Sequence, residues 1–133
     1  MSQQNVEAVR TAFEAYNRGD LDTAVADFAP DCEYISTGAL PGFRGVSRGP
    51  EGYKEFVGWL REEFDDARID VDELVEAGDR VLASITLCGR GRRSGVATTW
   101  SMWQVWTLRG GKFVRGQGFT NKGEALEAAG LEE

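Results

Sequence analysis

The second half of the chain alternates with a period of two, and this pattern constrains the fold more than any other feature. Four strand-like runs follow Arg68, and the turns between them are short and rich in glycine. Short connections make neighbouring strands antiparallel hairpin partners. The sequence therefore predicts a four-stranded antiparallel meander. Its strands span residues 68–76, 80–89, 96–109 and 112–120.

The first half of the chain carries helical spacing instead. Apolar residues recur at three- and four-residue intervals over residues 3–18, and Asp20 is placed to cap a second, short helix. Pro50 fits the first turn of a third helix. Asn121, with Glu124 three residues later, predicts a last short helix at the C-terminal end.

One short strand is predicted between the second and third helices. Residues 32–37 alternate and are rich in Tyr, Ile and Thr, whereas residues 38–49 hold four glycines and a proline and predict a long loop. The expected order is helix, helix, strand, helix and then the meander. Residues 1–133 therefore read as one α+β domain.

Composition excludes several classes of function. The 133 residues include no histidine, which removes Ser-His-Asp and Cys-His catalysis and histidine-based metal sites. The net charge of −7 lacks the positive surface that nucleic-acid binding needs. There is no apolar run of membrane length and no signal-peptide pattern. We expect a cytoplasmic protein with no cofactor and no nucleic-acid or membrane partner, in which Cys32 and Cys88 act as small buried hydrophobes.

Both faces of the predicted sheet carry apolar side chains, so both should be covered. One face would receive the three helices and the other a second copy of the chain, giving a homodimer. Helices cannot follow a bent sheet everywhere, and the leftover space suits a small, largely apolar molecule; a solidly packed core is the alternative. Gly116 and Gly118 either thin one wall of this space or permit curvature. The candidate ligand-binding residues are Tyr16, Tyr34, Tyr53, Trp59, Trp100, Met102, Gln104 and Trp106.

Several stretches carry a family likeness. They are VRTAFEAYNRGDLD at 9–22, FAPDCEY at 28–34, RGPEG at 48–52, VWTLRGGKFVR at 105–115 and EALEAAGL at 124–131. Over essentially its whole length the chain resembles the SnoaL-like branch of the nuclear-transport-factor-two-like superfamily. The resemblance implies a cone-shaped barrel, in which a strongly curved, mixed, mainly antiparallel sheet wraps around three N-terminal-half helices and a short C-terminal helix follows. It also implies a pocket at the open end and, commonly, a homodimer packed through the sheet.

This superfamily includes isomerases, cyclases, dehydratases, epoxide hydrolases and non-catalytic binders, so the resemblance does not select a function. Ketosteroid isomerases use a carboxylate base, a helix tyrosine and a protonated sheet aspartate. When the chain is aligned with them through residues 17–22, these positions fall on Ser36, Ala12 and close to Gln104. All three chemical groups are missing, so we expect that the isomerase mechanism does not transfer.

Three carboxylates remain as candidates for a general base. Asp31 and Glu33 flank the first strand, and Glu73 shares a face with Val71 if its strand is regular. Burial there would raise the pKa of Glu73, whereas a bulge would turn Leu74 inward and leave Glu73 on the surface. Three functions stay open. They are a binder of a small apolar molecule, a carboxylate-dependent isomerase, cyclase or hydrolase of a polyketide- or steroid-like substrate, and a dimeric interaction module with a vestigial pocket.

Overall fold

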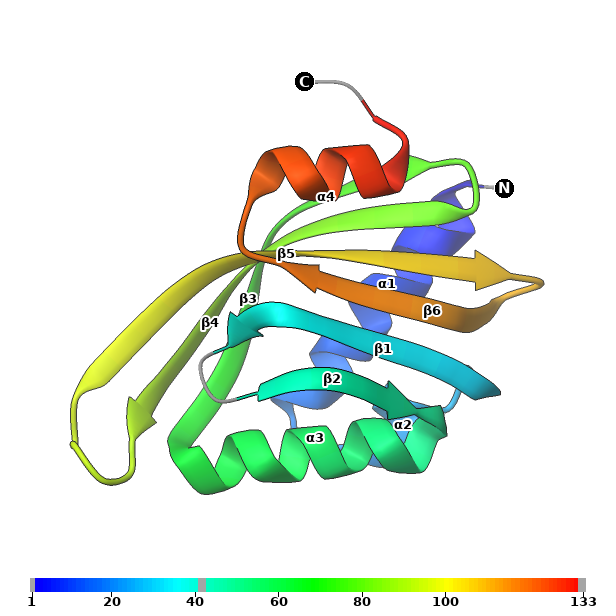
Figure 1. The fold of residues 1–133 in the computed structure, drawn as a ribbon. Helices are drawn as coiled ribbons and strands as arrows, with labels where there is room; N and C mark the ends of the chain where they lie inside the picture. The colour runs from blue at the N-terminus through cyan, green and yellow to red at the C-terminus, as the bar shows by residue number, and fades with distance from the viewer. Residues whose placement is uncertain (1, 41–42, 132–133) are drawn as a thin grey trace.

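The computed structural model describes residues 2–40 and 43–131 and has a strongly curved sheet with helices on both faces (Figure 1). The α+β class predicted from the sequence is confirmed. The elements in chain order are α1 (Ser2–Asn17), α2 (Leu21–Ala24), β1 (Phe28–Leu40), β2 (Phe43–Arg48), α3 (Gly49–Glu63), β3 (Phe64–Ala77), β4 (Arg80–Gly91), β5 (Ala97–Arg109), β6 (Lys112–Phe119) and α4 (Lys122–Ala129).

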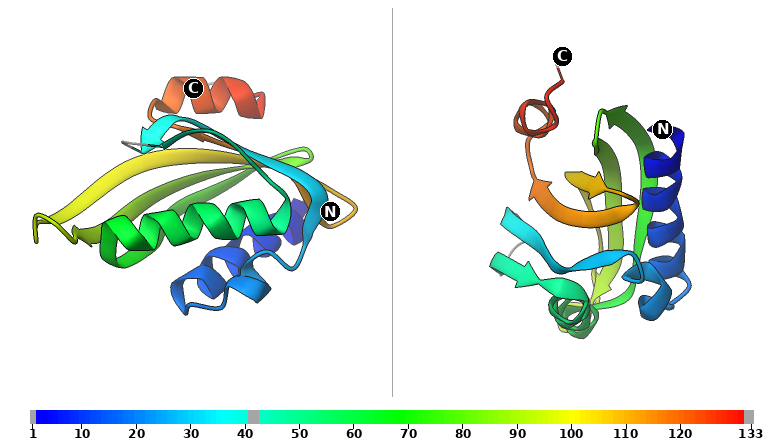
Figure 2. Two further views of the ribbon diagram at one scale, coloured as in Figure 1. Left: turned by 60° about the horizontal axis from the view of Figure 1, so that its bottom comes forward. Right: turned by 90° about the vertical axis from the view of Figure 1, so that its right-hand side faces the viewer.

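The sheet has six strands in the order β2-β1-β6-β5-β4-β3. β1 runs parallel to β6, and the other neighbouring strands are antiparallel, which confirms a mixed, mainly antiparallel sheet. The sheet is an open curve rather than a closed barrel, since β2 and β3 form its two edges. Helix α3 packs against β1, β2 and β3, so it bridges the opening between those edges (Figure 2).

The glycine-rich stretch predicted as a loop is largely a strand. β2 pairs antiparallel with β1, and the aligned pairs include Glu33 with Arg48 and Ile35 with Val46. The first strand is also longer than the predicted residues 32–37, because both β2 and β6 hydrogen-bond to it. Glycine and proline content suggested a loop here, but pairing with a partner that is already ordered outweighs weak strand propensity.

The predicted helix signals are present as capping interactions. The side chain of Asp20 accepts a hydrogen bond from the Thr23 amide, and the side chain of Asn121 accepts one from the Glu124 amide. Gly130 ends α4 with φ at 77°, a left-handed conformation that favours glycine.

A side chain that the sequence did not single out joins α1 to the sheet. Asn17, the last residue of α1, donates from Nδ2 to the Ile69 carbonyl at 2.7 Å and accepts the Ile69 amide at Oδ1 at 2.9 Å. The side-chain amide of Asn17 therefore pairs with the backbone N–H and carbonyl of Ile69 in β3, as the backbone of a neighbouring strand would. This contact fixes the C-terminal end of α1, including Tyr16, beneath the sheet.

We expect an Asn17→Ala variant to lose about 2 kcal/mol of unfolding free energy, because two hydrogen bonds disappear and two partly buried backbone groups lose their partner. Urea denaturation measures the loss. The exposed Glu14, on the same helix, provides the control, and Glu14→Ala should change the unfolding free energy by less than about 0.5 kcal/mol. Equal effects of the two substitutions would contradict a specific role for Asn17.

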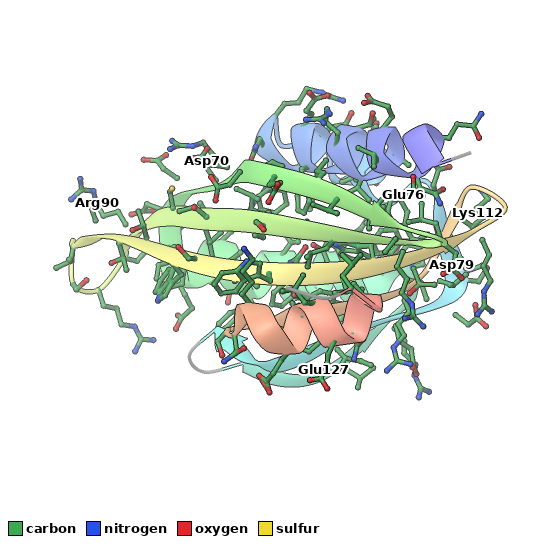
Figure 3. All side chains as sticks on the ribbon, turned by 90° about the horizontal axis from the view of Figure 1, so that it is seen from above. Asp70, Glu76, Asp79, Arg90, Lys112 and Glu127 are labelled. Atoms are coloured by element: carbon green, nitrogen blue, oxygen red, sulfur yellow. The ribbon has the colours of Figure 1, made fainter. Side chains whose placement is uncertain are left out.

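Two apolar clusters lie on opposite faces of the sheet. The larger lies between the concave face of the sheet and helices α1, α2 and α3, and its strand residues include Ile85 and Trp106. The smaller joins Leu82, Val105 and Phe119 of the convex face to Ala125 and Leu126 of α4. Figure 3 looks onto this convex face, with α4 lying over the sheet. The apolar residues that led us to expect a second copy of the chain here are therefore covered in part by the chain's own last helix.

Candidate functional site

The concave face of the sheet and the three helices beneath it enclose two small cavities. One, which we call the Trp106 cavity, has a volume of about 20 Å³, and the other, the Gln104 cavity, has a volume of about 10 Å³. The Trp106 cavity is lined by Val9, Ala12, Phe13, Tyr16, Ala24, Phe28, Tyr53, Trp106 and Phe113. The Gln104 cavity is lined by Tyr16, Tyr34, Tyr53, Phe56, Leu60, Ile69, Ile85, Leu87, Met102 and Gln104.

Tyr16 and Tyr53 contribute to both cavities, so the two spaces adjoin. Six of the eight residues predicted to bind a ligand lie in these linings, and their role in binding stays a prediction. Each cavity has room for about one water molecule at most. The interior is neither solid nor open, and a larger guest requires its side chains to move.

Aromatic rings form the wall between the sheet and the helices. Tyr34 stacks on Trp106 with ring centroids 5.5 Å apart, and Phe28 lies 5.7 Å from the same indole. Two glycines of β6 make this arrangement possible. A Cβ atom on Gly116 would lie 2.5 Å from the Trp106 ring, and one on Gly118 would lie 2.6 Å from the Tyr34 hydroxyl. The space that each glycine leaves is therefore occupied by a protein side chain, and the two predicted roles of these glycines stay predictions.

A buried chain of hydrogen bonds crosses this wall. Gln104 donates from Nε2 to the Tyr34 hydroxyl at 3.1 Å, and Trp106 donates from Nε1 to Oε1 of Gln104 at 2.9 Å. Only 3% of Gln104 is exposed. Because both ends of its amide are engaged, Gln104 holds the phenol and the indole in fixed orientations.

Tyr16 is the exception among these polar groups. Its hydroxyl is the one buried side-chain nitrogen or oxygen without a hydrogen-bond partner among the residues that the structure describes. The residue is 3% exposed and borders both cavities. The guanidinium of Arg61 lies 5.5 Å from the centre of the Tyr16 ring, and Arg61 also donates to the Tyr16 carbonyl at 3.4 Å. The ring is thus held in place while its hydroxyl has no acceptor.

The titratable groups of the interior stay uncharged at neutral pH. Burial raises the pKa of Tyr34 to about 12 and that of Tyr53 well above its usual value. Burial also raises the pKa of Tyr16, although the nearby Arg61 opposes the shift, and it raises the pKa of Cys32 to about 12. The phenols are therefore hydrogen-bond donors and not bases, so the interior favours a neutral guest that carries an acceptor such as a carbonyl oxygen.

None of the three candidate carboxylates lines either cavity. Asp31 is exposed, and the half-buried Glu33 forms an ion pair with Arg48 at 2.9 Å. The pairing of β3 with β4 shifts by one residue between Val71 and Glu73, so the strand has the bulge rather than the regular pairing. As a result Leu74 packs against the core and Glu73 is exposed. A base at one of these carboxylates would have to act from outside the two cavities.

Two of the predicted ligand-binding residues also lie outside the cavities. Trp59 is half-buried on α3, and with Phe56 it borders an open surface groove between α3 and β2. Trp100 lies near the start of β5, where its ring meets that of Phe64 edge-on with centroids 4.9 Å apart. Helical spacing put Trp59 at the flank of the apolar face of its helix, and alternation put Trp100 on the same face as Gln104, but neither pattern reveals how far the cavities extend.

Sequence reasoning missed several lining residues. Phe28 is the first residue of β1 and Phe113 the second residue of β6, and both rings border the Trp106 cavity. Regular alternation would place Phe113, three residues from Gly116, on the opposite face. The pairing of β5 with β6 shifts between Thr107 and Leu108, however, and brings Phe113 to the concave face. Helical spacing placed Phe28 on the apolar side of the second helix, but that helix ends at Ala24 and Phe28 is the first residue of β1.

Further features of the described residues concern metal-ligand clusters, cysteines and membrane-spanning helices. Within residues 2–40 and 43–131, no group of three or more Cys, Asp or Glu side chains is arranged to hold a metal ion. Cys32 is buried and Cys88 half-buried, and both are free. No helix in the described part of the chain is both long and apolar enough to cross a membrane.

Comparisons with known proteins now identify the family. The SnoaL-like domain family matches residues 9–116. The chain is 39% identical over 102 residues to aklanonic acid methyl ester cyclase AcmA of Streptomyces galilaeus, covering 74% of this chain and 67% of AcmA. It is 33% identical over 88 residues to nogalonic acid methyl ester cyclase of Streptomyces nogalater, covering 64% of this chain and 63% of that one. The chain thus spans about two thirds of the length of these relatives.

Solved structures agree over a longer stretch. An NTF2-like protein of Burkholderia thailandensis has a TM-score of 0.80 and 26% identity, with 96% of this chain and 98% of that chain covered. TerC, co-crystallized with polyporic acid, has a TM-score of 0.79 and 25% identity over 96% of this chain and 98% of its own. The chain therefore belongs to the SnoaL-like domain family and has the NTF2-like fold.

Proposed function

We propose that this protein binds a small, largely apolar molecule in the space beneath its curved sheet, and that the molecule carries a hydrogen-bond acceptor. The observation that carries the proposal is the Tyr16 hydroxyl, which is buried between two cavities and has no partner among the described residues. A buried hydroxyl without a partner destabilises the folded protein by about 1–3 kcal/mol. A guest with a carbonyl or quinone oxygen would supply the missing acceptor.

The relatives support this class of guest. AcmA and the nogalonic acid methyl ester cyclase are named for polyketide-like methyl esters, and TerC was co-crystallized with polyporic acid. The stacked rings of Tyr34 and Trp106 offer a flat apolar surface to such a molecule. Since the two cavities together provide only about 30 Å³, from 20 and 10 Å³, binding requires ring side chains to change rotamer, as is common at binding sites.

A Tyr16→Phe variant tests the proposal through two effects of opposite sign. We expect the unfolding free energy to rise by about 1 kcal/mol, because an unpaired buried hydroxyl is removed. We expect affinity for a dihydroxyanthraquinone, used as a carbonyl-bearing aromatic probe, to fall about five-fold, because one hydrogen bond is lost. Urea denaturation measures the first effect and quenching of tryptophan fluorescence the second.

Tyr34→Phe is the matched control, since the Tyr34 hydroxyl already accepts a hydrogen bond from Gln104. This variant should lose about 1–2 kcal/mol of unfolding free energy. If Tyr16→Phe is destabilised in the same way, the Tyr16 hydroxyl is already satisfied inside the protein. The observation behind the proposal would then be removed.

The second candidate function is ring closure of a polyketide ester, and the 39% identity to AcmA favours it. Such chemistry needs a group that moves a proton next to a carbonyl. No carboxylate lines the two cavities, and the phenols there are too weakly acidic to be ionised at neutral pH. We therefore expect aklanonic acid methyl ester to bind without turnover, and chromatographic detection of a cyclised product would establish the enzyme instead.

The third candidate, a dimeric module with a vestigial pocket, differs from the first in having no guest. We propose a homodimer through the part of the convex face that α4 leaves uncovered, where Thr99 and Ser101 are exposed and Trp103 is half-buried. Light scattering should give the mass of two chains, and Ser101→Arg should return the mass of one.

We also propose a cytoplasmic location, supported by the two free cysteines, which suit a reducing compartment.

A further inference from the structure

We propose that the guest is amphipathic, with an aromatic body beneath the sheet and a neutral, hydroxyl-rich end in a polar groove beside it. This inference rests on the proposed binding function and adds a second subsite to it. The polar groove lies between α1, α2 and the start of β6, at the end of the sheet that faces the viewer in the right-hand view of Figure 2. Lys112, labelled in Figure 3, marks the same end.

The polar groove is larger than the interior cavities. Its volume is about 200 Å³, ten times the 20 Å³ of the Trp106 cavity. It therefore has room for a substituent that the collapsed interior cannot hold. The groove is lined by Gln4, Glu7, Ala8, Thr11, Ala12, Thr23, Ala24, Asp27 and Phe113.

The groove and the Trp106 cavity share part of their linings. Ala12, Ala24 and Phe113 border both spaces, so nothing thicker than these side chains separates them. Two of the three are alanines, whose methyl groups leave the boundary thin. The third, Phe113, is 3% exposed and packs its ring 5.5 Å from that of Trp106. Rotation of the Phe113 ring would join the two spaces, and a guest could then extend from one into the other.

The polar groove and the Trp106 cavity differ in the polarity of their linings. The Trp106 cavity is apolar apart from tyrosine hydroxyls and the indole, whereas the groove presents an amide, two hydroxyls and two carboxylates. The carboxylates are already paired, Glu7 with Arg10 at 3.5 Å and Asp27 with Lys112 at 3.7 Å. Because their charge is compensated nearby, the groove favours neutral hydroxyl groups, which can both donate and accept, over an ammonium or an anion.

A pair of probes separates this inference from the proposed function. A dihydroxyanthraquinone tests the interior alone, and its mono-O-glucoside adds a neutral hydroxyl-rich group to the same ring system. We expect the glucoside to bind at least as tightly as the parent compound by isothermal titration calorimetry. A Thr11→Trp variant should weaken the glucoside about ten-fold and the parent less than about two-fold, because exposed Thr11 lines the groove but not the Trp106 cavity.

Glu14→Trp is the matched control, since Glu14 is exposed on the same helix and lines neither space. It should leave both affinities unchanged. Binding of the parent with exclusion of the glucoside, or an equal effect of Thr11→Trp on the two probes, would overturn the inference while leaving the proposed function intact. Failure of both probes to bind would overturn the inference and the proposed function together. Binding of the glucoside alone would support the groove as the dominant subsite.

Discussion

Gly116→Ala is expected to lose about 2–3 kcal/mol of unfolding free energy, although it adds a single methyl group. Gly116 pairs directly with Trp106 across β5 and β6, and its added Cβ would lie 2.5 Å from the indole ring. The ring cannot shift easily, because Phe28, Tyr34 and Phe113 all pack against it with centroids 5.5–5.7 Å away. Either the ring or strand β6 must move, and urea denaturation measures the resulting loss.

The matched control is the same substitution where space is free. Gly58 lies inside α3, and a Cβ built there meets no heavy atom within 4 Å. Gly58→Ala should therefore raise the unfolding free energy by about 0.5–1 kcal/mol, through helix propensity alone. If Gly116→Ala is as stable as the parent protein, the Trp106 ring does not lie against β6, and the aromatic wall described above is wrong.

Local signals in the sequence were sufficient for most of the fold. Alternation located the four strands of the meander, and the side chains of Asp20 and Asn121 cap helices as predicted. Strand β2 was missed because the four glycines of residues 38–49 weaken strand propensity, and its pairing with β1 is a contact between segments that periodicity does not report. The same holds for Asn17, whose role depends on reaching Ile69 in a distant part of the chain.

The candidate site was predictable in its composition but not in its details. Alternation placed Met102, Gln104 and Trp106 on the concave face, and all three line the cavities. The direction of Glu73 depended on whether its strand was regular, and the sequence could not decide that. In the structure, the extra residue of the bulge, Asp72, accepts a hydrogen bond from Thr86 on β4 at 2.8 Å. Cavity volume depends on how rings of several sizes interlock, so alternation predicts a lining but not its fit.

Gln104→Leu is expected to lose about 3 kcal/mol of unfolding free energy. The substitution replaces the amide with an apolar side chain of similar size, and it leaves the Tyr34 hydroxyl and the Trp106 indole N–H without the partners they have now. Each unsatisfied buried group destabilises the folded state by about 1–3 kcal/mol. Urea denaturation measures the loss, and quenching of tryptophan fluorescence by the anthraquinone probe reports whether the indole has also turned.

A double-mutant cycle shows how much of this loss comes from the hydrogen bonds rather than from packing. In a Tyr34→Phe background the phenol oxygen is already absent, so Gln104→Leu leaves only the Trp106 N–H unpaired. We expect the substitution to be less harmful there by about 1–2 kcal/mol. Additive losses would contradict a buried hydrogen-bonded chain. The interior would then be held by ring packing alone, and the hydroxyls of Tyr16 and Tyr53 would be the polar groups left for a guest.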